Sequence, residues 1–176
     1  MQMNVMSKNT SVKYIVLIAL SYCFIASCNT NNAATLAGTQ VSAVKDSATN
    51  LMNSIAKDIS HDGPIAWLKY FEKSPGFFMA SDGQIAFANN DSATAFVQNV
   101  LVKNIKQIQL QWSNIRIDAL TPTLASIGAN FHEELTDFSS KVMPFNGYFT
   151  ALAEQTSTGW QLRNLHWSIV PLPPKE

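Results

Sequence analysis

The chain has 176 residues, of which 47% are hydrophobic, and its 12 lysine and arginine residues balance its 12 acidic residues. This length suffices for one domain with a single hydrophobic core. Arg116 and Arg163 are the only arginines, and the sequence has no basic cluster of the kind that replaces counterions on a nucleic acid. The composition therefore argues against a nucleic-acid-binding protein.

The first 27 residues have the order of a secretory signal peptide. Lys8 and Lys13 form a short basic start, and the stretch from Tyr14 to Ala26 is almost wholly apolar. This stretch is shorter than the ~20 apolar residues that a transmembrane helix needs. It ends in Ile25-Ala26-Ser27-Cys28, which resembles the processing site of bacterial lipoproteins, where the cysteine is lipidated and becomes the first residue of the mature chain.

The lipoprotein interpretation predicts a leader at residues 1–27, lipidation of Cys28, and a lipid anchor in the bacterial cell envelope, on its periplasmic or surface side. Two other fates stay open: cleavage by the ordinary signal peptidase, which would release a soluble protein, and retention as an uncleaved anchor. Without the leader Cys28 is the only cysteine, so no disulfide can form within the chain. Residues 28–39 are small and polar and are expected to form a flexible tether.

The domain is predicted at residues 40–170 and starts with helices. From Val41 to Ile59 apolar residues recur at spacings of three and four, which predicts an amphipathic helix of about five turns. Pro64 suits the first position of a second helix, which contains Trp67 and stops before Pro75.

A hairpin and a third helix are expected next. Asp82-Gly83 between two short apolar runs predicts a β-hairpin. Asn90 or Asp91 is expected to cap the following helix. The predicted buried face of this helix consists of Ala93, Phe96, Val97, Val100 and Leu101.

From Ile105 onward apolar and polar residues alternate, which predicts β-strands. Trp112 and Ile115 have opposite parity, so a bulge is expected near Ser113. Three further strands are predicted at 124–134, 145–154 and 160–168. The proline-rich tail of residues 171–176 cannot continue a strand and ends the domain. Helices first and antiparallel strands afterwards indicate an α+β fold.

The last two strands carry three short motifs: Gly147-Tyr148-Phe149-Thr150, Gly159-Trp160-Gln161-Leu162 and His166-Trp167-Ser168. With these motifs, the chain from Val41 to Ser168 resembles the nuclear transport factor 2-like superfamily, particularly its SnoaL-like and ketosteroid-isomerase-like branches and the association domain of calmodulin-dependent kinase. The resemblance implies a cone of three N-terminal helices packed in a strongly curved, mainly antiparallel sheet, with a pocket and frequent dimerisation through the sheet. Members include isomerases, cyclases and dehydratases as well as domains that only bind or assemble, so the fold does not define an activity.

The register of the last hairpin decides which side chains would face a pocket. If Glu154 pairs with Trp160, then Tyr148 faces His166 on one side of the sheet, whereas a slip of one residue would exchange these partners. Aromatic residues of earlier elements would complete a lining that suits a flat, mainly apolar molecule. The predicted ligand-pocket residues are Tyr70, Trp112, Phe131, Tyr148, Thr150, Trp160, Leu162, Asn164 and His166.

Two of these residues are also candidates for catalysis. His166 could act as a general acid or base and Tyr148 as an oxyanion donor, although a structural histidine and a packing tyrosine are the favoured explanations. No carboxylate can be matched to the catalytic base of the isomerases. His132, Glu134 and His166 have the donor types of a metal triad, but the two histidines are expected about 10 Å apart, at ~4.8 Å per strand, so no metal site is predicted.

These observations lead to one functional hypothesis and two alternatives. The hypothesis is a lipid-anchored envelope domain that needs no cofactor and binds a small apolar molecule in its pocket, forms a homodimer, or does both. The first alternative is an isomerase, dehydratase or cyclase that uses His166 and Tyr148. The second is an interaction module with a filled cavity. The aromatic content of the predicted lining favours binding over catalysis.

Overall fold

In the computed structural model the described residues are 36–171. The predicted leader, Cys28, most of the tether and residues 172–176 of the tail lie outside this range. Among the described residues, no helix is long and apolar enough to span a membrane.

The long amphipathic helix is confirmed as α2 (Gly38–Asp62). Its predicted stripe is buried against the sheet and consists of Val44, Ala48, Leu51, Met52, Ile55 and Ile59. Gly63 ends the helix at a φ of 77°, a left-handed conformation that favours glycine, and its N–H donates to the carbonyl oxygen of Ile59. The predicted second helix is the short 3₁₀-helix η1 (Pro64–Lys69), with proline in its first turn.

The predicted hairpin is formed by β1 (Phe78–Ser81) and β2 (Gln84–Phe87). Asp82 and Gly83 both have positive φ, as a tight two-residue hairpin turn requires. The third helical segment comprises α3 (Asn90–Phe96), the π-helical turn η2 (Val97–Leu101) and the short α4 (Val102–Asn104).

Two details of the third helix differ from the prediction. The cap is Asn89, one residue earlier than predicted, and its Oδ1 accepts a 2.9 Å hydrogen bond from the Ser92 N–H. Ala93 and Val97 are buried as expected, but the prediction was wrong for Phe96 and Val100, which are 38% and 44% exposed. For Val100 the reason is the π-helical turn, because its wider spacing moves residues off the face that a regular α-helix would bury. Phe96 lies before this turn, and its ring packs against Phe87 of β2 at 5.1 Å.

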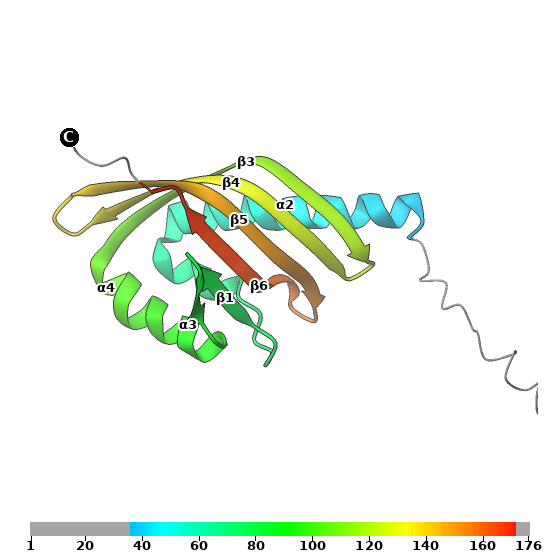
Figure 1. Ribbon diagram of the computed structural model, residues 1–176, viewed down its shortest axis with the longest axis horizontal. Helices are drawn as coiled ribbons and strands as arrows, with labels where there is room; N and C mark the ends of the chain where they lie inside the picture. The colour runs from blue at the N-terminus through cyan, green and yellow to red at the C-terminus, as the bar shows by residue number, and fades with distance from the viewer. Residues whose placement is uncertain (1–35, 172–176) are drawn as a thin grey trace, which may run out of the picture. The chain divides into compact units, whose positions relative to one another are not determined.

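Four long strands follow: β3 (Ile105–Thr121), β4 (Leu124–Asp137), β5 (Val142–Thr156) and β6 (Gly159–Ile169). The sheet order is β2-β1-β6-β5-β4-β3, and only the β1–β6 pair is parallel. The predicted bulge in β3 is confirmed, because the register shifts between Ser113 and Arg116 and Asn114 has a φ of 50°. The sheet curves over α2, with the hairpin, α3 and α4 below one end (Figure 1). The predicted α+β cone is therefore the observed fold.

An aromatic cluster fills the space between α2 and the sheet. Its centre is Trp167, whose ring lies 4.4 Å from Phe131 and 5.1 Å from Phe149, measured between ring centroids. Trp112 lies in the same cluster, and its indole N–H donates to the carbonyl oxygen of Met52 in α2 at 3.0 Å. The buried indole thus keeps a hydrogen-bond partner while its ring packs in the core.

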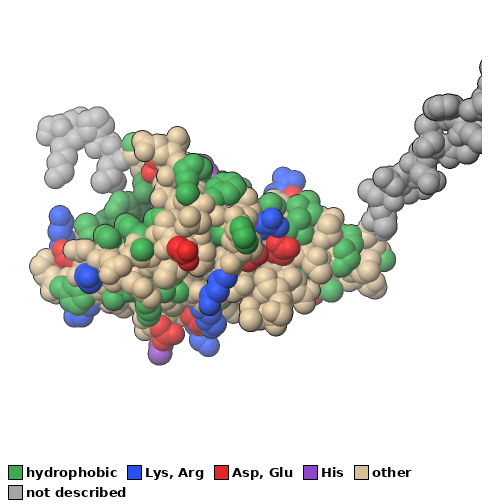
Figure 2. All heavy atoms as spheres, turned by 90° about the horizontal axis from the view of Figure 1, so that it is seen from below, with side chains coloured by type: hydrophobic (Ala, Val, Ile, Leu, Met, Phe, Trp, Pro, Cys, Tyr) green, Lys and Arg blue, Asp and Glu red, His purple; other side chains and the backbone are tan. Residues whose placement is uncertain are grey.

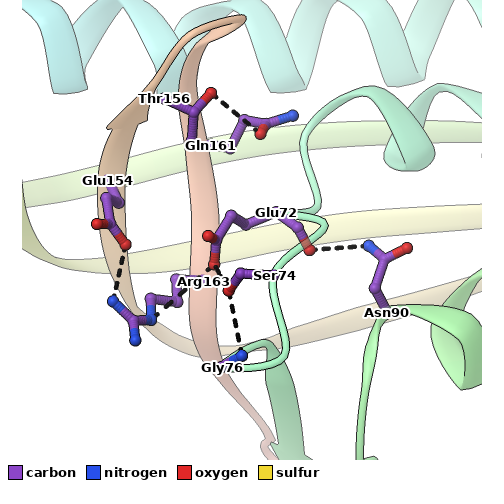
Figure 3. Close-up of polar contacts among 8 residues, drawn as sticks. All are labelled: Glu72, Ser74, Gly76, Asn90, Glu154, Thr156, Gln161 and Arg163. Carbon is purple, nitrogen blue, oxygen red and sulfur yellow. Dashed lines mark hydrogen bonds and ion pairs between the residues drawn. The ribbon is translucent and has the colours of Figure 1, made fainter.

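A polar cluster attaches the segment before β1 to the last two strands (Figure 3). The buried carboxylate of Glu72 accepts a 2.7 Å hydrogen bond from Ser74 and lies 3.9 Å from the guanidinium of Arg163. Arg163 also donates to Glu154 at 2.8 Å. A β-bulge in β6 makes this arrangement possible, since Arg163 is an extra residue with no partner in β5.

Candidate functional site

A partly open cavity of about 320 Å³ lies between the helical segments, the β1–β2 hairpin and the concave side of the sheet. Hydrophobic side chains gather around a hollow on the face shown in Figure 2. Thirteen of the fifteen lining residues are apolar, and the other two are Ser81 and Glu133. The apolar lining is Trp67, Phe71, Met79, Ala86, Phe87, Phe96, Val97, Leu101, Ile108, Leu135, Leu165, Trp167 and Ile169.

Strand alternation brings Glu133 into this cavity. Side chains of β4 point alternately to the concave and the outer side of the sheet, and Phe131, Glu133 and Leu135 share the concave side. Glu133 pairs with Leu110 of β3 on one side and with Phe145 of β5 on the other. A carboxyl group therefore occupies a position at which the strand pattern otherwise places an apolar side chain.

The surroundings of Glu133 perturb its acidity. Glu133 is half-buried, and its position among apolar side chains raises its pKa to about 7, because the charged form loses part of its hydration. Within residues 36–171 no side chain forms a hydrogen bond or ion pair with its carboxyl group. The hydroxyl of Ser81, the other polar group of the lining, donates to Asp82 at 3.0 Å. Glu133 can thus bind or release a proton near neutral pH inside an apolar cavity.

The pairing of Glu154 with Trp160 was wrong, and next to the turn the strands have the one-residue slip that the sequence left open. Glu154 pairs with Gln161, and beyond the bulge at Arg163 the offset grows to two residues, so that Tyr148 lies opposite Ser168. The bulge changes the parity of the buried residues between Leu162 and Leu165, but the alternation of one strand does not give its offset against the partner strand.

The two catalytic candidates share one side of the sheet, but that side is the outer face and not the concave one, so both lie outside the cavity. Tyr148 and His166 are both exposed on the outer face of the sheet, and Tyr148 retains 43% of its accessible surface. Thr150, the partner of His166 across the strands, is exposed on the same face. None of the three lines the cavity.

The other predicted lining residues do not line this cavity, although Trp112 and Phe131 border one surface hollow together with Tyr148, and Tyr70 and Trp160 border another. Trp112, Phe131 and Leu162 pack in or against the core. Trp160 borders a surface hollow between α2 and the β5–β6 turn. The side-chain oxygen of Asn164 is buried without a hydrogen-bond partner among the described residues.

Tyr70 belongs to a separate cluster at the junction of α2 and η1. Its hydroxyl donates to the Asp58 carboxylate at 2.6 Å, and Lys69 forms an ion pair with the same carboxylate. Desolvation and this hydrogen bond raise the pKa of Tyr70 to about 12. The hydrogen bonds from Lys69 and Tyr70 lower the pKa of Asp58. The cluster connects two helices and lies outside the cavity lining.

The residues considered for a metal site lie on the outer face of the sheet. His132 contacts Asn146 at 2.9 Å and Glu134 at 3.5 Å. His166 lies on β6, separated from His132 on β4 by the whole of β5. In the described part of the chain, no group of three or more histidine, cysteine, aspartate and glutamate side chains is arranged to hold a metal ion.

Sequence reasoning therefore missed the one ionisable group that the structure brings into the cavity. The signal was present, since Glu133 has the parity of the inward-facing Phe131, opposite to that of His132 and Glu134. The fold and the cavity together define an α+β cone with an apolar pocket.

No protein-family model and no curated protein matches the chain. Solved structures do match. A nuclear transport factor 2-like superfamily protein from Salmonella enterica is 16% identical, with a TM-score of 0.62, and the match covers 76% of this chain and 95% of that protein. A putative scytalone dehydratase from Novosphingobium aromaticivorans is 11% identical, with a TM-score of 0.63, and the match covers 73% of this chain and 85% of that protein.

A putative calcium/calmodulin-dependent protein kinase II association domain from Xanthomonas campestris is 14% identical, with a TM-score of 0.57, and the match covers 70% of this chain and 86% of that protein. The chain has the cone-shaped fold of the nuclear transport factor 2-like superfamily. Proteins with this fold are named both as enzymes and as association domains, so the site and not the fold must carry the functional argument.

Proposed function

We propose that the domain binds a small, mainly apolar molecule in the cavity beneath the hairpin and α3. The observation that carries the proposal is the cavity itself, of about 320 Å³ with a lining that is apolar at thirteen of fifteen positions. The volume of the cavity is within the size range of small-molecule sites in proteins. Its lining also resembles theirs, because it combines an apolar wall with few polar groups. An interaction module with a filled cavity is less well supported, since Trp112 and Phe131 pack in the core and leave this space open.

The binding proposal can be tested with a neutral apolar probe. We expect 2-ethylnaphthalene to bind the purified protein in isothermal titration calorimetry. Ala86→Phe places a ring at the lining of the cavity and should weaken this binding at least tenfold. Ala88→Phe adds the same ring just after the end of β2, at a residue that does not line the cavity, and should leave binding unchanged. Equal binding by both variants would reject the cavity as the site. Native mass spectrometry of the protein from its own host would then identify a co-purified molecule.

We propose that the domain is held at the bacterial cell envelope by a lipid on Cys28. The support comes from the sequence, in which a basic start and an apolar stretch end in Ala26-Ser27-Cys28. In a bacterial host fed an alkyne-labelled fatty acid, the wild-type chain should incorporate the label and sediment with membranes. Cys28→Ser should lose both properties, while Cys23→Ser should retain them. Label on the Cys28→Ser variant would overturn the proposal.

An enzyme of the isomerase, dehydratase or cyclase type is a second candidate, and Glu133 favours it. A carboxyl group with a pKa near neutrality can accept a proton from a bound molecule and return it. His166 and Tyr148 face away from the cavity and do not contribute to this chemistry. Protein-dependent exchange of the α-protons of 1-tetralone in D₂O, followed by NMR and abolished in Glu133→Gln, would support catalysis. Identical exchange with both proteins would exclude it for this substrate class.

We also propose a homodimer formed through the outer face of the sheet. This face has a hollow whose border includes the exposed Tyr148 and Val170 together with Asn130 and Asn146. Amide side chains both donate and accept hydrogen bonds, so the same surface can pair with itself about a twofold axis. Sedimentation velocity should show a dimer that Tyr148→Arg dissociates. A monomeric wild-type protein at micromolar concentration would contradict this.

A further inference from the structure

We infer that the molecule bound in the cavity carries a protonated amine on an apolar body, and that the carboxylate of Glu133 is its counter-ion. This inference rests on the proposed binding function and specifies its ligand class.

The cavity has no positive charge of its own to balance Glu133. The lining residues contributed by η1, β1, β2, α3, η2, β3 and β6 are apolar except for Ser81. Among the described residues, Glu133 is the only ionisable side chain that lines the cavity, and burial is the only cause that perturbs it. An ionised carboxylate in such surroundings is costly unless a partner donates hydrogen bonds to it. In the partly open cavity water can hydrate the half-buried carboxylate, and a bound ligand that displaces this water must supply the hydrogen bonds in its place.

An ammonium group meets this requirement better than a neutral group. It offers three N–H donors and a full positive charge, and charge-assisted hydrogen bonds to a carboxylate are roughly twice as strong as neutral ones. A neutral apolar ligand would displace water from the carboxylate without replacing its hydrogen bonds. Such a ligand should consequently bind best when Glu133 is protonated, which is the opposite pH preference from that of an amine.

The aromatic residues of the lining support a cationic ligand independently of Glu133. Five of the fifteen lining residues are Trp67, Phe71, Phe87, Phe96 and Trp167. The rings of Trp67 and Phe71 stack at 5.7 Å, and Trp167 meets Trp67 edge-on. Aromatic faces attract cations through their quadrupole, and this attraction grows when the cation is desolvated. The same rings provide apolar contact area for the body of the ligand.

The test compares 2-(aminomethyl)naphthalene with 2-ethylnaphthalene, a neutral molecule of nearly the same shape, by isothermal titration calorimetry at pH 6.0 and pH 8.5. Because Glu133 passes from mostly protonated to mostly ionised over this interval, the Kd of the amine should fall about tenfold. The Kd of the neutral probe should stay constant or rise.

Two variants test whether the pH dependence of amine binding comes from the Glu133 carboxylate. Glu133→Gln should weaken binding of the amine at pH 8.5 about tenfold and remove its pH dependence, while the neutral probe still binds and shows that the cavity is intact. Glu134→Gln changes a neighbouring side chain that faces the outer side of the sheet, and it should behave as the wild type does.

The binding results distinguish a failure of the amine inference from a failure of the apolar-ligand proposal on which it rests. Binding of 2-ethylnaphthalene without tighter binding of the amine at pH 8.5 would overturn the amine inference and leave the apolar-ligand proposal standing. The same conclusion follows if Glu133→Gln retains the pH dependence. If neither probe binds the wild-type protein at either pH, both the inference and the binding proposal fail.

Discussion

Glu133→Gln replaces the carboxyl group in the cavity by an amide of nearly the same shape that cannot ionise. In the folded protein, burial raises the pKa of this carboxyl from its ordinary value of 4.5 to about 7. In the unfolded chain the group is hydrated and titrates near its ordinary value. Between these two pH values the folded state binds a proton that the unfolded state has released, so the free energy of unfolding falls as the pH rises.

The size of the effect follows from the difference between the two values. Each unit corresponds to about 1.4 kcal/mol, so the full penalty of an ionised Glu133 is at most about 3.5 kcal/mol well above pH 7. Well below pH 4.5 the carboxyl is protonated in both states and the penalty is absent. Glu133→Gln should therefore leave stability nearly unchanged at pH 4.5 and increase it by up to about 3.5 kcal/mol at pH 8.5.

Urea unfolding monitored by tryptophan fluorescence at pH 4.5, 6.0 and 8.5 measures this difference. Trp67 and Trp167 lie in the core and report the loss of packing. Glu134→Gln is the matched control, because Glu134 lies on the outer face of the same strand, and its pH profile should parallel that of the wild type. Parallel profiles for wild type and Glu133→Gln would refute the argument, since they would show that the Glu133 carboxyl is hydrated in the folded protein.

Three further predictions concern stability. Trp167→Ala should cost about 3–5 kcal/mol in urea unfolding, because it empties the centre of the aromatic cluster; a loss below about 1 kcal/mol would mean that the cluster repacks. Gly147→Ala should strongly lower the melting temperature, since its Cβ would overlap a backbone carbonyl of β6, while Gly38→Ala meets nothing and should be neutral or stabilising. Arg163→Ala should cost about 1–3 kcal/mol because it leaves Glu72 buried without a cation, and Glu72→Gln should recover part of this loss in a double-mutant cycle. Additive effects would show that Arg163 does not stabilise Glu72.

Much of the fold could be predicted because its signals are local. The apolar stripe of α2 is recognised from residue spacings of three and four, and the Asp82-Gly83 turn from two residues that accept positive φ. The bulge in β3 is visible as a change in which alternate residues of the strand are apolar. The α+β order follows from the same periodicities. The leader and Cys28 are likewise features of sequence alone and stay predictions, since the described residues begin at Leu36.

The candidate site could not be predicted to the same extent. Tyr148 and His166 share one side of the sheet in both the hypothesised and the observed register, because the two offsets differ by two residues, but alternation does not tell which side is concave. The bulge at Arg163 puts Leu162 on the opposite face from His166, and contacts of Arg163 with Glu72 and Glu154 stabilise that bulge from distant parts of the chain. Glu133 was overlooked for a related reason. Its parity shows that it shares a side with Phe131, but parity does not tell which parts of that side are covered by helix and which are open.

The sequence by itself determined the order of helices and strands and most of the residues that share a face of α2 and of the strands, because backbone geometry fixes those periods within a few residues. The tertiary structure alone decided the offset between β5 and β6, which face became concave, and where the cavity formed. These features depend on packing between segments that are far apart in the chain, and the cavity lining joins residues from Trp67 to Ile169. A carboxyl group that local pattern marks only as a strand residue becomes, through that packing, the one ionisable group of the described cavity lining.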